Sequence, residues 1–92
     1  MLLSRWASTF RRVDLAAAVA ENVRALRARR QWQQSQLADL LNISQRAVST
    51  LESGKRTDVG IVELTALCRV FGEPLEELLR GADPADLRTL GL

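Results

Sequence analysis

Residues 34–56 read QSQLADLLNISQRAVSTLESGKR. In this stretch the apolar residues recur at helical spacing in two short groups, with Asn42 between them. Because Asn accepts left-handed backbone angles better than most residues, a first helix over about 34–41 is expected to end there. Ser44 is suited to cap a second helix over about 45–53, since its hydroxyl accepts hydrogen bonds from free backbone N–H groups. The stretch therefore predicts two short helices joined by a tight turn.

The predicted helix over 45–53 has one apolar side, formed by Ala47, Val48 and Leu51. Its other positions are polar and face outward or sideways: Gln45, Arg46, Ser49 and Thr50. Two helices joined by a turn have a specific chemical use, because the second helix can enter the major groove of DNA. The pattern therefore favours a DNA-binding function.

Helical spacing predicts three further helices, over about 15–29, 61–71 and 74–80. Asp14 is a suitable N-cap for the first, and Gly72 is a suitable end for the second. A proline in the first turn is favourable, so the third helix is expected to open at Pro74. The residues expected to end this helix are Gly81, Asp83 and Pro84. The last residues are predicted to form a short C-terminal segment.

The composition favours helices and argues against most enzymatic functions. Sixteen Leu and twelve Ala stand against seven Val and two Ile in a chain of 92 residues, which is enough for one domain. With no His and one Cys, the chain cannot build a His-based catalytic triad, a Cys/His zinc site or an internal disulfide. We expect an all-α domain that is not an enzyme and holds no metal or cofactor.

Residues 15–80 resemble the helix-turn-helix proteins of the phage repressor and Cro type, the XRE family. The matching positions in the central stretch are Gln34, Leu37-Ala38, Ser44, Val48-Ser49, Leu51-Glu52 and Gly54-Lys55-Arg56. The pattern continues through Leu67 and Phe71-Gly72 to Leu75-Glu76-Glu77-Leu78-Leu79. The resemblance implies a five-helix lambda-repressor-like DNA-binding domain that binds an operator as a dimer and reads bases with residues 45–53.

Within that resemblance, side-chain chemistry suggests a role for each polar residue. Gln45 can bond the N6 and N7 atoms of adenine, and Arg46 can bond O6 and N7 of guanine; Ser49 and Thr50 are secondary base contacts. The expected phosphate contacts are Gln34, Ser44, Lys55, Arg56 and Thr57. Capping alone would explain Ser44, and an exposed Arg or Gln outside such a motif is by default only solvated.

The family resemblance also implies a structural ion pair between Arg27 and Glu52. Cys68 falls where the family usually has a small core residue, so we interpret it as a small hydrophobe. Two positions depart from the family pattern. Gln31 stands where a Gly commonly closes the first helix, and Gln33 stands where Ser or Thr commonly caps the second.

The chain is predicted to consist of an N-terminal segment over 1–14, the domain over 15–80 and a tail over 81–92. Apolar residues spaced for a short amphipathic helix precede the domain: Leu3, Trp6, Phe10 and Val13. This stripe has three possible uses: packing on the domain's own core, binding a second subunit or another protein, or serving as an arm whose arginines follow DNA phosphates. The arginines are Arg5, Arg11 and Arg12. A dimer contact is possible through Leu75, Leu79, Leu87 and Leu90.

Charge is distributed unevenly along the chain. Residues 1–36 carry seven Arg and two acidic residues, a net charge of +5, whereas residues 61–92 carry three Arg and six acidic residues, a net charge of −3. A basic N-terminal part suits an anionic partner such as DNA. No apolar stretch is long enough to span a bilayer and no signal sequence is evident, so a cytoplasmic protein is expected.

Two functions follow from these observations. The first is a sequence-specific transcriptional regulator, most simply a repressor, that binds an inverted-repeat DNA operator as a homodimer. The alternative is an antitoxin-type interaction module that neutralises a protein partner through the N-terminal stripe and represses its own gene.

Overall fold

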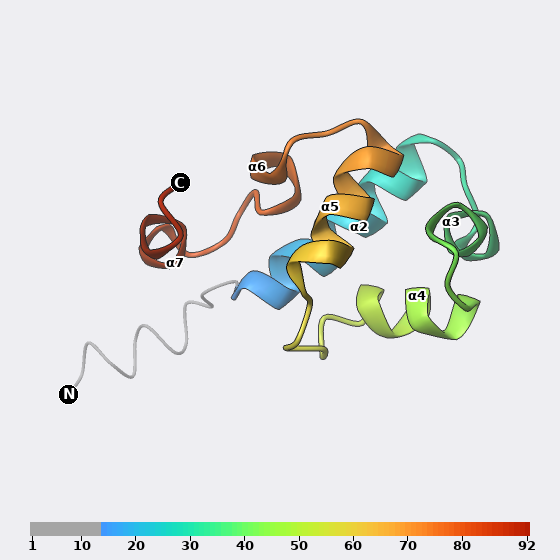
Figure 1. Ribbon diagram of the computed structural model, residues 1–92, viewed down its shortest axis with the longest axis horizontal. Helices are drawn as coiled ribbons and strands as arrows, with labels where there is room; N and C mark the ends of the chain where they lie inside the picture. Colours follow the sequence, from blue (N-terminus) through green and yellow to red (C-terminus); the bar gives the residue numbers. More distant parts are fainter. Residues whose placement is uncertain (1–13) are drawn as a thin grey trace.

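A computed structural model of the chain describes residues 14–92, and every regular element in that range is a helix (Figure 1). The elements are α2 (Leu15–Arg29), α3 (Gln34–Leu41), α4 (Gln45–Glu52), α5 (Ile61–Phe71), α6 (Leu75–Leu78) and α7 (Pro84–Thr89). The prediction of an all-α helix-turn-helix domain is confirmed. The N-terminal stripe of Leu3, Trp6, Phe10 and Val13 lies outside the described residues.

Helix α2 is the central element of the domain. It begins where Asp14 accepts a hydrogen bond from the Ala17 N–H at 2.8 Å. Its buried face includes Val19, Val23 and Leu26, at the expected helical spacing. This face packs on α4 and α6, while α3 packs on α4 and α5. A single core results, and its largest fully buried side chains come from five helices: Val23, Leu26, Leu37, Val48, Leu67, Phe71 and Leu78.

An aromatic cluster joins the end of α2 to the end of α5. The rings of Trp32 and Phe71 are stacked with their centroids 5.7 Å apart. The guanidinium of Arg30 lies 5.6 Å from the first ring centroid and 5.3 Å from the second, within cation–π range. Arg30 also donates a hydrogen bond to the Phe71 carbonyl at the C-terminal end of α5. Its position therefore serves the domain's own packing.

The C-terminal part of the chain differs from the prediction in two ways. Helix α6 ends at Leu78 because the side-chain amide of Asn22, on α2, donates to the carbonyls of Leu78 at 2.7 Å and Arg80 at 2.9 Å. These bonds replace the next turn of helix. Pro74 is the N-cap of α6 and lies just before the helix instead of in its first turn.

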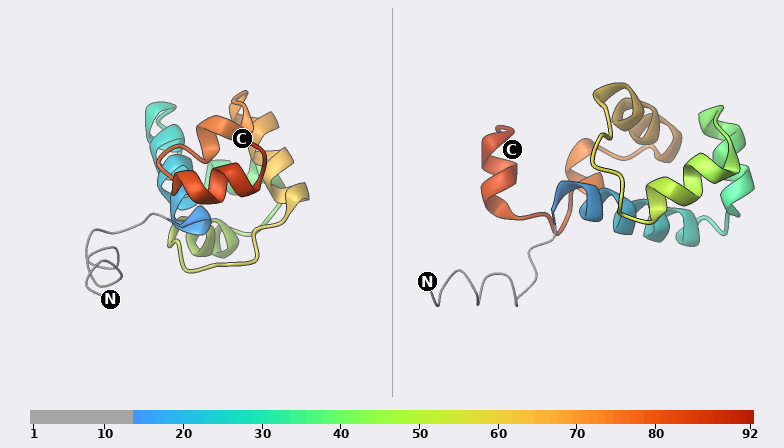
Figure 2. Two further views of the ribbon diagram at one scale, coloured as in Figure 1. Left: turned by 90° about the vertical axis from the view of Figure 1, so that its left-hand side faces the viewer. Right: turned by 90° about the horizontal axis from the view of Figure 1, so that it is seen from below.

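Helix α7 was not predicted. Asp83 accepts a hydrogen bond from the Ala85 N–H at 2.9 Å, and Pro84 occupies the first helical position, where its missing N–H costs nothing. Asp83 and Pro84, which are expected from the sequence to end the preceding helix, therefore start a new helix. Figures 1 and 2 place α7 at the opposite end of the molecule from α3 and α4.

The departure at Gln31 has a structural consequence. Gln31 follows the C-cap of α2 with φ 57°, a left-handed conformation that strains residues other than glycine. Two bonds close the helix around it: the Gln31 N–H donates to the Ala28 carbonyl at 3.0 Å and the Trp32 N–H donates to the Arg27 carbonyl at 3.1 Å. The same fold is thus reached with a less suitable residue.

Replacing Gln31 with Gly is expected to raise the free energy of unfolding by about 1 kcal/mol, because glycine adopts positive φ without strain. The measurement is urea unfolding monitored by circular dichroism. Gln33→Gly is the matched control, since Gln33 has φ −81° and ψ 163°, an extended conformation open to any residue. A Gln31→Gly variant no more stable than the parent would show that position 31 is not strained.

Candidate nucleic-acid interface

The turn between α3 and α4 is fixed by backbone geometry and one hydroxyl. Asn42 has φ 58° and ψ 45°, the left-handed conformation expected of it. The Ile43 N–H then donates to the Ala38 carbonyl at 3.0 Å, which closes α3. Ser44 caps α4, because its Oγ accepts from the Ala47 N–H at 3.0 Å. The chain therefore reverses within three residues and sets α4 across the end of α3.

The start of α3 is stabilised in an unexpected way. Gln33 is the N-cap, and its own N–H donates to the side-chain oxygen of Gln36 at 2.7 Å. Gln36, at the third helical position, thus supplies the bond of a capping box that runs from the N3 side chain back to the N-cap backbone. This boundary, where Gln33 departs from the family pattern, falls at the predicted residue.

Helix α4 has one buried and one exposed side. Val48 is completely buried and Leu51 is 2% exposed, so these two side chains anchor the helix to the core. The four predicted base-contacting residues are all exposed: Gln45, Arg46, Ser49 and Thr50. In the part of the chain that the structure describes, nothing covers this outer face. The face is therefore accessible to a large partner.

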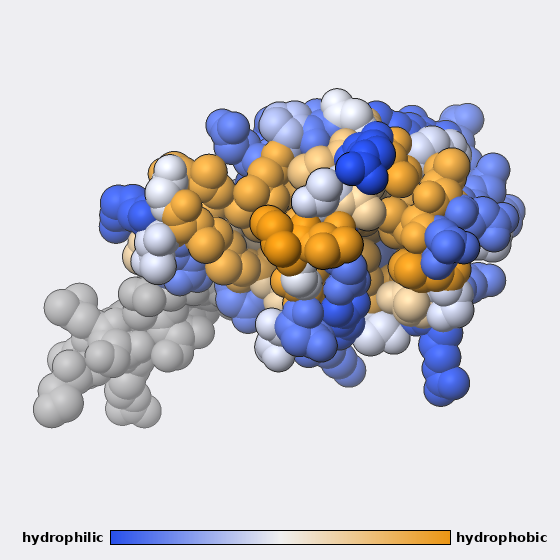
Figure 3. Space-filling view, in the orientation of Figure 1, coloured by the Kyte–Doolittle hydropathy of each residue, from blue (hydrophilic) through white to orange (hydrophobic). Residues whose placement is uncertain are grey.

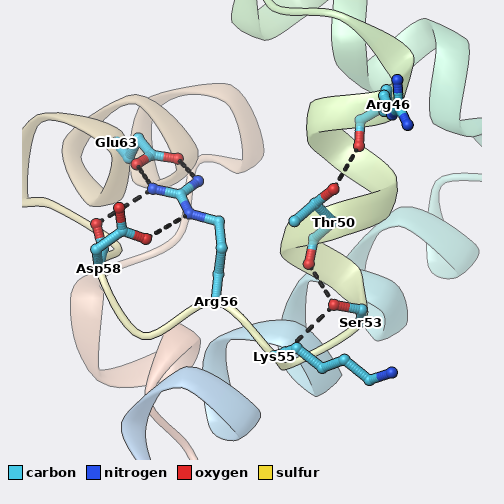
Figure 4. Close-up of polar contacts among 7 residues, drawn as sticks. All are labelled: Arg46, Thr50, Ser53, Lys55, Arg56, Asp58 and Glu63. Atoms are coloured by element: carbon cyan, nitrogen blue, oxygen red, sulfur yellow. Dashed lines mark hydrogen bonds and ion pairs between the residues drawn. The ribbon is translucent and has the colours of Figure 1, made fainter.

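Hydrogen bonds within α4 arrange part of this face (Figure 4). The Thr50 hydroxyl donates to the Arg46 carbonyl at 2.9 Å, and the Ser53 hydroxyl donates to the Thr50 carbonyl at 2.6 Å. Ser53 Oγ also accepts from the Lys55 N–H at 3.2 Å. Ser53 was not singled out from the sequence, yet it connects the end of α4 to the exposed Lys55.

The ion pair expected between Arg27 and Glu52 is present and joins α2 to α4. Arg27 Nε lies 2.7 Å from Glu52 Oε2, and Nη2 lies 3.0 Å from Oε1, so the pair is bidentate. Arg27 also donates to the Trp32 carbonyl at 2.9 Å, and Arg24 donates to the Glu52 carbonyl. Glu52 is the one buried charged residue among those the structure describes, at 5% exposure.

Gln34 takes part in the same network. Its side-chain amide donates to Glu52 Oε1 at 3.0 Å, which ties the first residue of α3 to the last residue of α4. Gln34 is half-buried. The structure therefore gives it a positioning role that the sequence alone did not indicate, beside the phosphate contact expected of it.

This network changes the ionisation of its members. Burial alone would raise the pKa of Glu52, but hydrogen bonds from Arg27 and Gln34, with the charges of Arg27 and Arg24, outweigh it and lower that pKa below its ordinary value. The hydrogen bond with Glu52 in turn raises the pKa of Arg27. Both groups are therefore charged over the physiological range.

Arg56 forms ion pairs with two carboxylates of the domain (Figure 4). Its Nε donates to Asp58 Oδ1 at 2.9 Å and its Nη1 donates to Glu63 Oε2 at 2.6 Å. These hydrogen bonds lower the pKa of Glu63 and the pKa of Asp58. Arg56 therefore fixes the loop after α4 to the first turn of α5, and the phosphate contact expected of it stays a prediction. Thr57 is exposed and lines an apolar groove between α2 and α5, and its phosphate contact likewise stays a prediction.

Apart from Thr57, the predicted site residues separate into two groups. One group lies together at the outer face of α4 and just beyond it: Ser44, Gln45, Arg46, Ser49, Thr50 and Lys55. Neither Arg46 nor Lys55 pairs with an acidic side chain within residues 14–92. The other group, Arg27, Gln34, Glu52 and Arg56, forms hydrogen bonds inside the domain. The free positive charge of the interface therefore comes from Arg46 and Lys55.

This geometry defines a class: a domain that presents a short, exposed polar helix behind a tight turn, as DNA-reading helix-turn-helix domains do. Residues 23–78 match the family described as Helix-turn-helix, from within α2 to the end of α6. The chain belongs to the XRE-type helix-turn-helix family of DNA-binding proteins. The resemblance inferred from the sequence is confirmed.

A solved structure supports the same fold. The crystal structure of the hypothetical transcription factor NHTF from Neisseria aligns with a TM-score of 0.68 and 25% sequence identity. The alignment covers 84% of this chain and 85% of that chain. No curated protein matches this chain significantly.

None of the helices within residues 14–92 has the length and apolar character needed to cross a bilayer.

Replacing Glu52 with Gln is expected to lower the free energy of unfolding by about 2 kcal/mol, because Arg27 loses its charged partner in a mostly buried position. Urea unfolding of the two chains measures the difference. Glu63→Gln is the control: it removes a partner of Arg56 at a more exposed pair, and such pairs contribute less than about 1 kcal/mol. Equal losses in the two variants would contradict a special role for Glu52.

The lowered pKa of Glu52 also predicts an acid-dependent stability. Below the ordinary value of 4.5 the unfolded chain takes up a proton at this group before the folded chain does, so stability falls as the pH falls. The contribution is complete above the unfolded pKa and is lost as the pH passes through the folded pKa. Glu52→Gln is expected to flatten the dependence of the urea midpoint on pH between about pH 6 and about pH 3. An unchanged acid slope would contradict this.

Proposed function

We propose that the protein is a sequence-specific transcriptional regulator, acting as a repressor, that reads an inverted-repeat operator with α4 in the major groove. The observation that carries the proposal is the division of α4 into a buried apolar side and an exposed side bearing Gln45, Arg46, Ser49 and Thr50. The family match and the similarity to a hypothetical transcription factor support it. A bound repressor acts by occupying its operator.

Base recognition is assigned to two side chains. Gln45 lies at the first position of α4 and Arg46 at the second, the end of a reading helix that contacts base edges. Gln45 pairs with adenine and Arg46 with guanine, each through two hydrogen bonds worth about 1 to 3 kcal/mol of discrimination. The Thr50 hydroxyl donates to the Arg46 carbonyl, so its methyl group is the part suited to a thymine methyl. Ser49 is a secondary contact.

Phosphate contacts position the domain on the duplex. The first turn of α3 offers backbone N–H groups and the positive end of the helix dipole, and Gln34 lies at that turn. Lys55 follows α4 and adds a full charge. Ser44 is exposed at the other end of α4, where its hydroxyl also serves as the cap. Because such contacts release counterions, binding is expected to weaken steeply with added salt.

We infer that two copies bind together, since one reading helix of eight residues contacts only one half-site. A dimer with twofold symmetry would place its two reading helices about 34 Å apart, one turn of DNA. The leucines expected to form the dimer contact are largely used within the chain: Leu79 is 3% exposed, and Leu75 and Leu87 pack against the core. Of that set, Leu90 alone is more than half exposed. The dimer surface is therefore left unassigned.

The antitoxin-type alternative depends on Leu3, Trp6, Phe10 and Val13, which lie outside the described residues. It therefore receives no separate support from the fold.

The test uses duplexes selected from a random pool by the full chain, followed by titration of Arg46→Ala. Selection is expected to enrich an inverted repeat, and the substitution is expected to lower operator affinity about tenfold or more, because one bidentate base contact is lost. Fluorescence anisotropy of labelled duplex gives the affinity.

Arg88→Ala is the matched control for the loss of one positive charge, since Arg88 is exposed on α7 at the far end of the molecule. Its operator affinity is expected to stay within a factor of about two of the parent. If selection enriches no sequence, or if the two variants weaken binding equally, the proposed base reading is wrong.

A further inference from the structure

An apolar groove of about 380 Å³ opens on the molecule away from the outer face of α4. It lies between the start of α2, the loop before α5, the helix α6 and the C-terminal residues. The lining side chains that matter most here are Leu15, Val59, Ile61, Leu75, Leu90 and Leu92. Ile61 is 70% exposed, Leu90 53% and Leu92 50%. Leaving so much apolar surface in water on a small domain is unfavourable, which indicates that something covers it.

Figure 3 shows the same feature on the surface, where apolar side chains extend from the region of α7 towards the start of α5. The polar face of α4 is not part of the lining. The groove is therefore separate from the proposed DNA interface, and its occupant need not be DNA.

The C-terminal part of the chain, which contributes much of the groove, carries a net negative charge. Residues 61–92, which include α5, α6 and α7, hold six acidic residues and three arginines. Among the helices this charge lies on α6, which holds Glu76 and Glu77 and no basic residue, whereas α5 and α7 each hold one acidic residue and one arginine. An occupant with an apolar stripe and positive charge would match both the leucine lining and the negative charge of α6.

The first thirteen residues of the chain have that chemistry. Their apolar residues Leu3, Trp6, Phe10 and Val13 are spaced 3, 4 and 3, which is one face of a helix. Arg5, Arg11 and Arg12 are their charged residues, and they contain no Asp or Glu.

Chain connection also favours these residues over a separate partner. The segment ends beside Asp14, and Leu15, the next residue, lines the groove. A tether this short gives a local concentration in the millimolar range, far above that of a second molecule in dilute solution. Asp14, the N-cap of α2, has an extended backbone at φ −69° and ψ 171°, which lets the chain change direction there.

We propose that residues 1–13 dock in this groove of their own chain, with Trp6 and Phe10 on the leucines and the arginines beside the acidic helix α6. The segment would then complete the hydrophobic core at the end of the domain opposite α3. The inference goes beyond DNA binding and does not depend on it.

Trp6 provides a direct readout. The chain has two tryptophans, so Trp32→Phe leaves Trp6 as the single reporter in the full-length protein. Docking predicts that Trp6 emission is shifted to the blue relative to the urea-denatured chain and is protected from acrylamide quenching. Both properties are expected to stay constant on dilution. If Trp32→Phe does not fold, the difference spectrum between the parent and Trp6→Phe isolates the same signal.

Two neighbouring substitutions on α5 separate docking from general effects. Ile61→Glu places a carboxylate in the groove, whereas Val62→Glu places one at the next residue, which is 80% exposed and outside the lining. Ile61→Glu is expected to increase acrylamide quenching of Trp6 to near the denatured level, while Val62→Glu leaves it unchanged.

Three results would overturn the proposal. Trp6 as accessible as in the denatured chain would show an empty groove. Protection lost on dilution would assign the groove to a second copy, and equal effects of the two glutamates would show that Trp6 is buried elsewhere. None of these results bears on operator binding, which is measured separately.

Discussion

The geometry of the domain depends on the hydrogen bonds that the buried carboxylate of Glu52 accepts. This carboxylate receives hydrogen bonds from Arg27 on α2 and Gln34 on α3, and it belongs to α4. An isolated helix of eight residues is unstable in water, so α4 takes its stability and direction from tertiary contacts. Val48 and Leu51 supply the apolar part of those contacts, and Glu52 links the last turn of α4 to α2 and to the first residue of α3.

This arrangement separates the charges that hold the domain together from those that are available to a partner. Arg27 and Arg56 are bound to carboxylates, and Arg30 lies on aromatic rings. Arg46 and Lys55 have no acidic partner within residues 14–92. In the proposed DNA complex, attraction would therefore come from a few side chains that are already placed next to the reading helix, which limits the ordering required on binding.

Much of the fold could be predicted from the sequence, because local signals and tertiary packing agree in the central stretch. The apolar spacing, the cap at Ser44 and the left-handed Asn42 placed α3 and α4 to within a residue. The prediction failed at α6 and α7. The end of α6 is set by Asn22, which is 56 residues away from Leu78 in the sequence. The spacing of apolar residues within one helix cannot predict a contact between such distant residues. Helix α7 did have a local signal, Asp83 before Pro84, which was interpreted as a break.

The candidate site shows the same limit. The outward direction of Gln45, Arg46, Ser49 and Thr50 follows from helical periodicity, so it was predictable. The pairing of Arg56 with Asp58 and Glu63 depends on how the loop folds back on α5, and neither local spacing nor the family resemblance indicated it. The hydrogen bond from Gln34 to Glu52 joins the ends of two helices, and only their mutual orientation reveals it.

The central claim is that the outer face of α4 enters a DNA groove while the rest of the domain stays as folded. The most direct measurement is an NMR titration of the ¹⁵N-labelled full chain with a duplex obtained by selection. The largest shifts are expected at the backbone amides of residues 34–36, 44–50 and 55, with small changes along α7. Shifts centred on α6 and α7, with α4 unaffected, would contradict the claim.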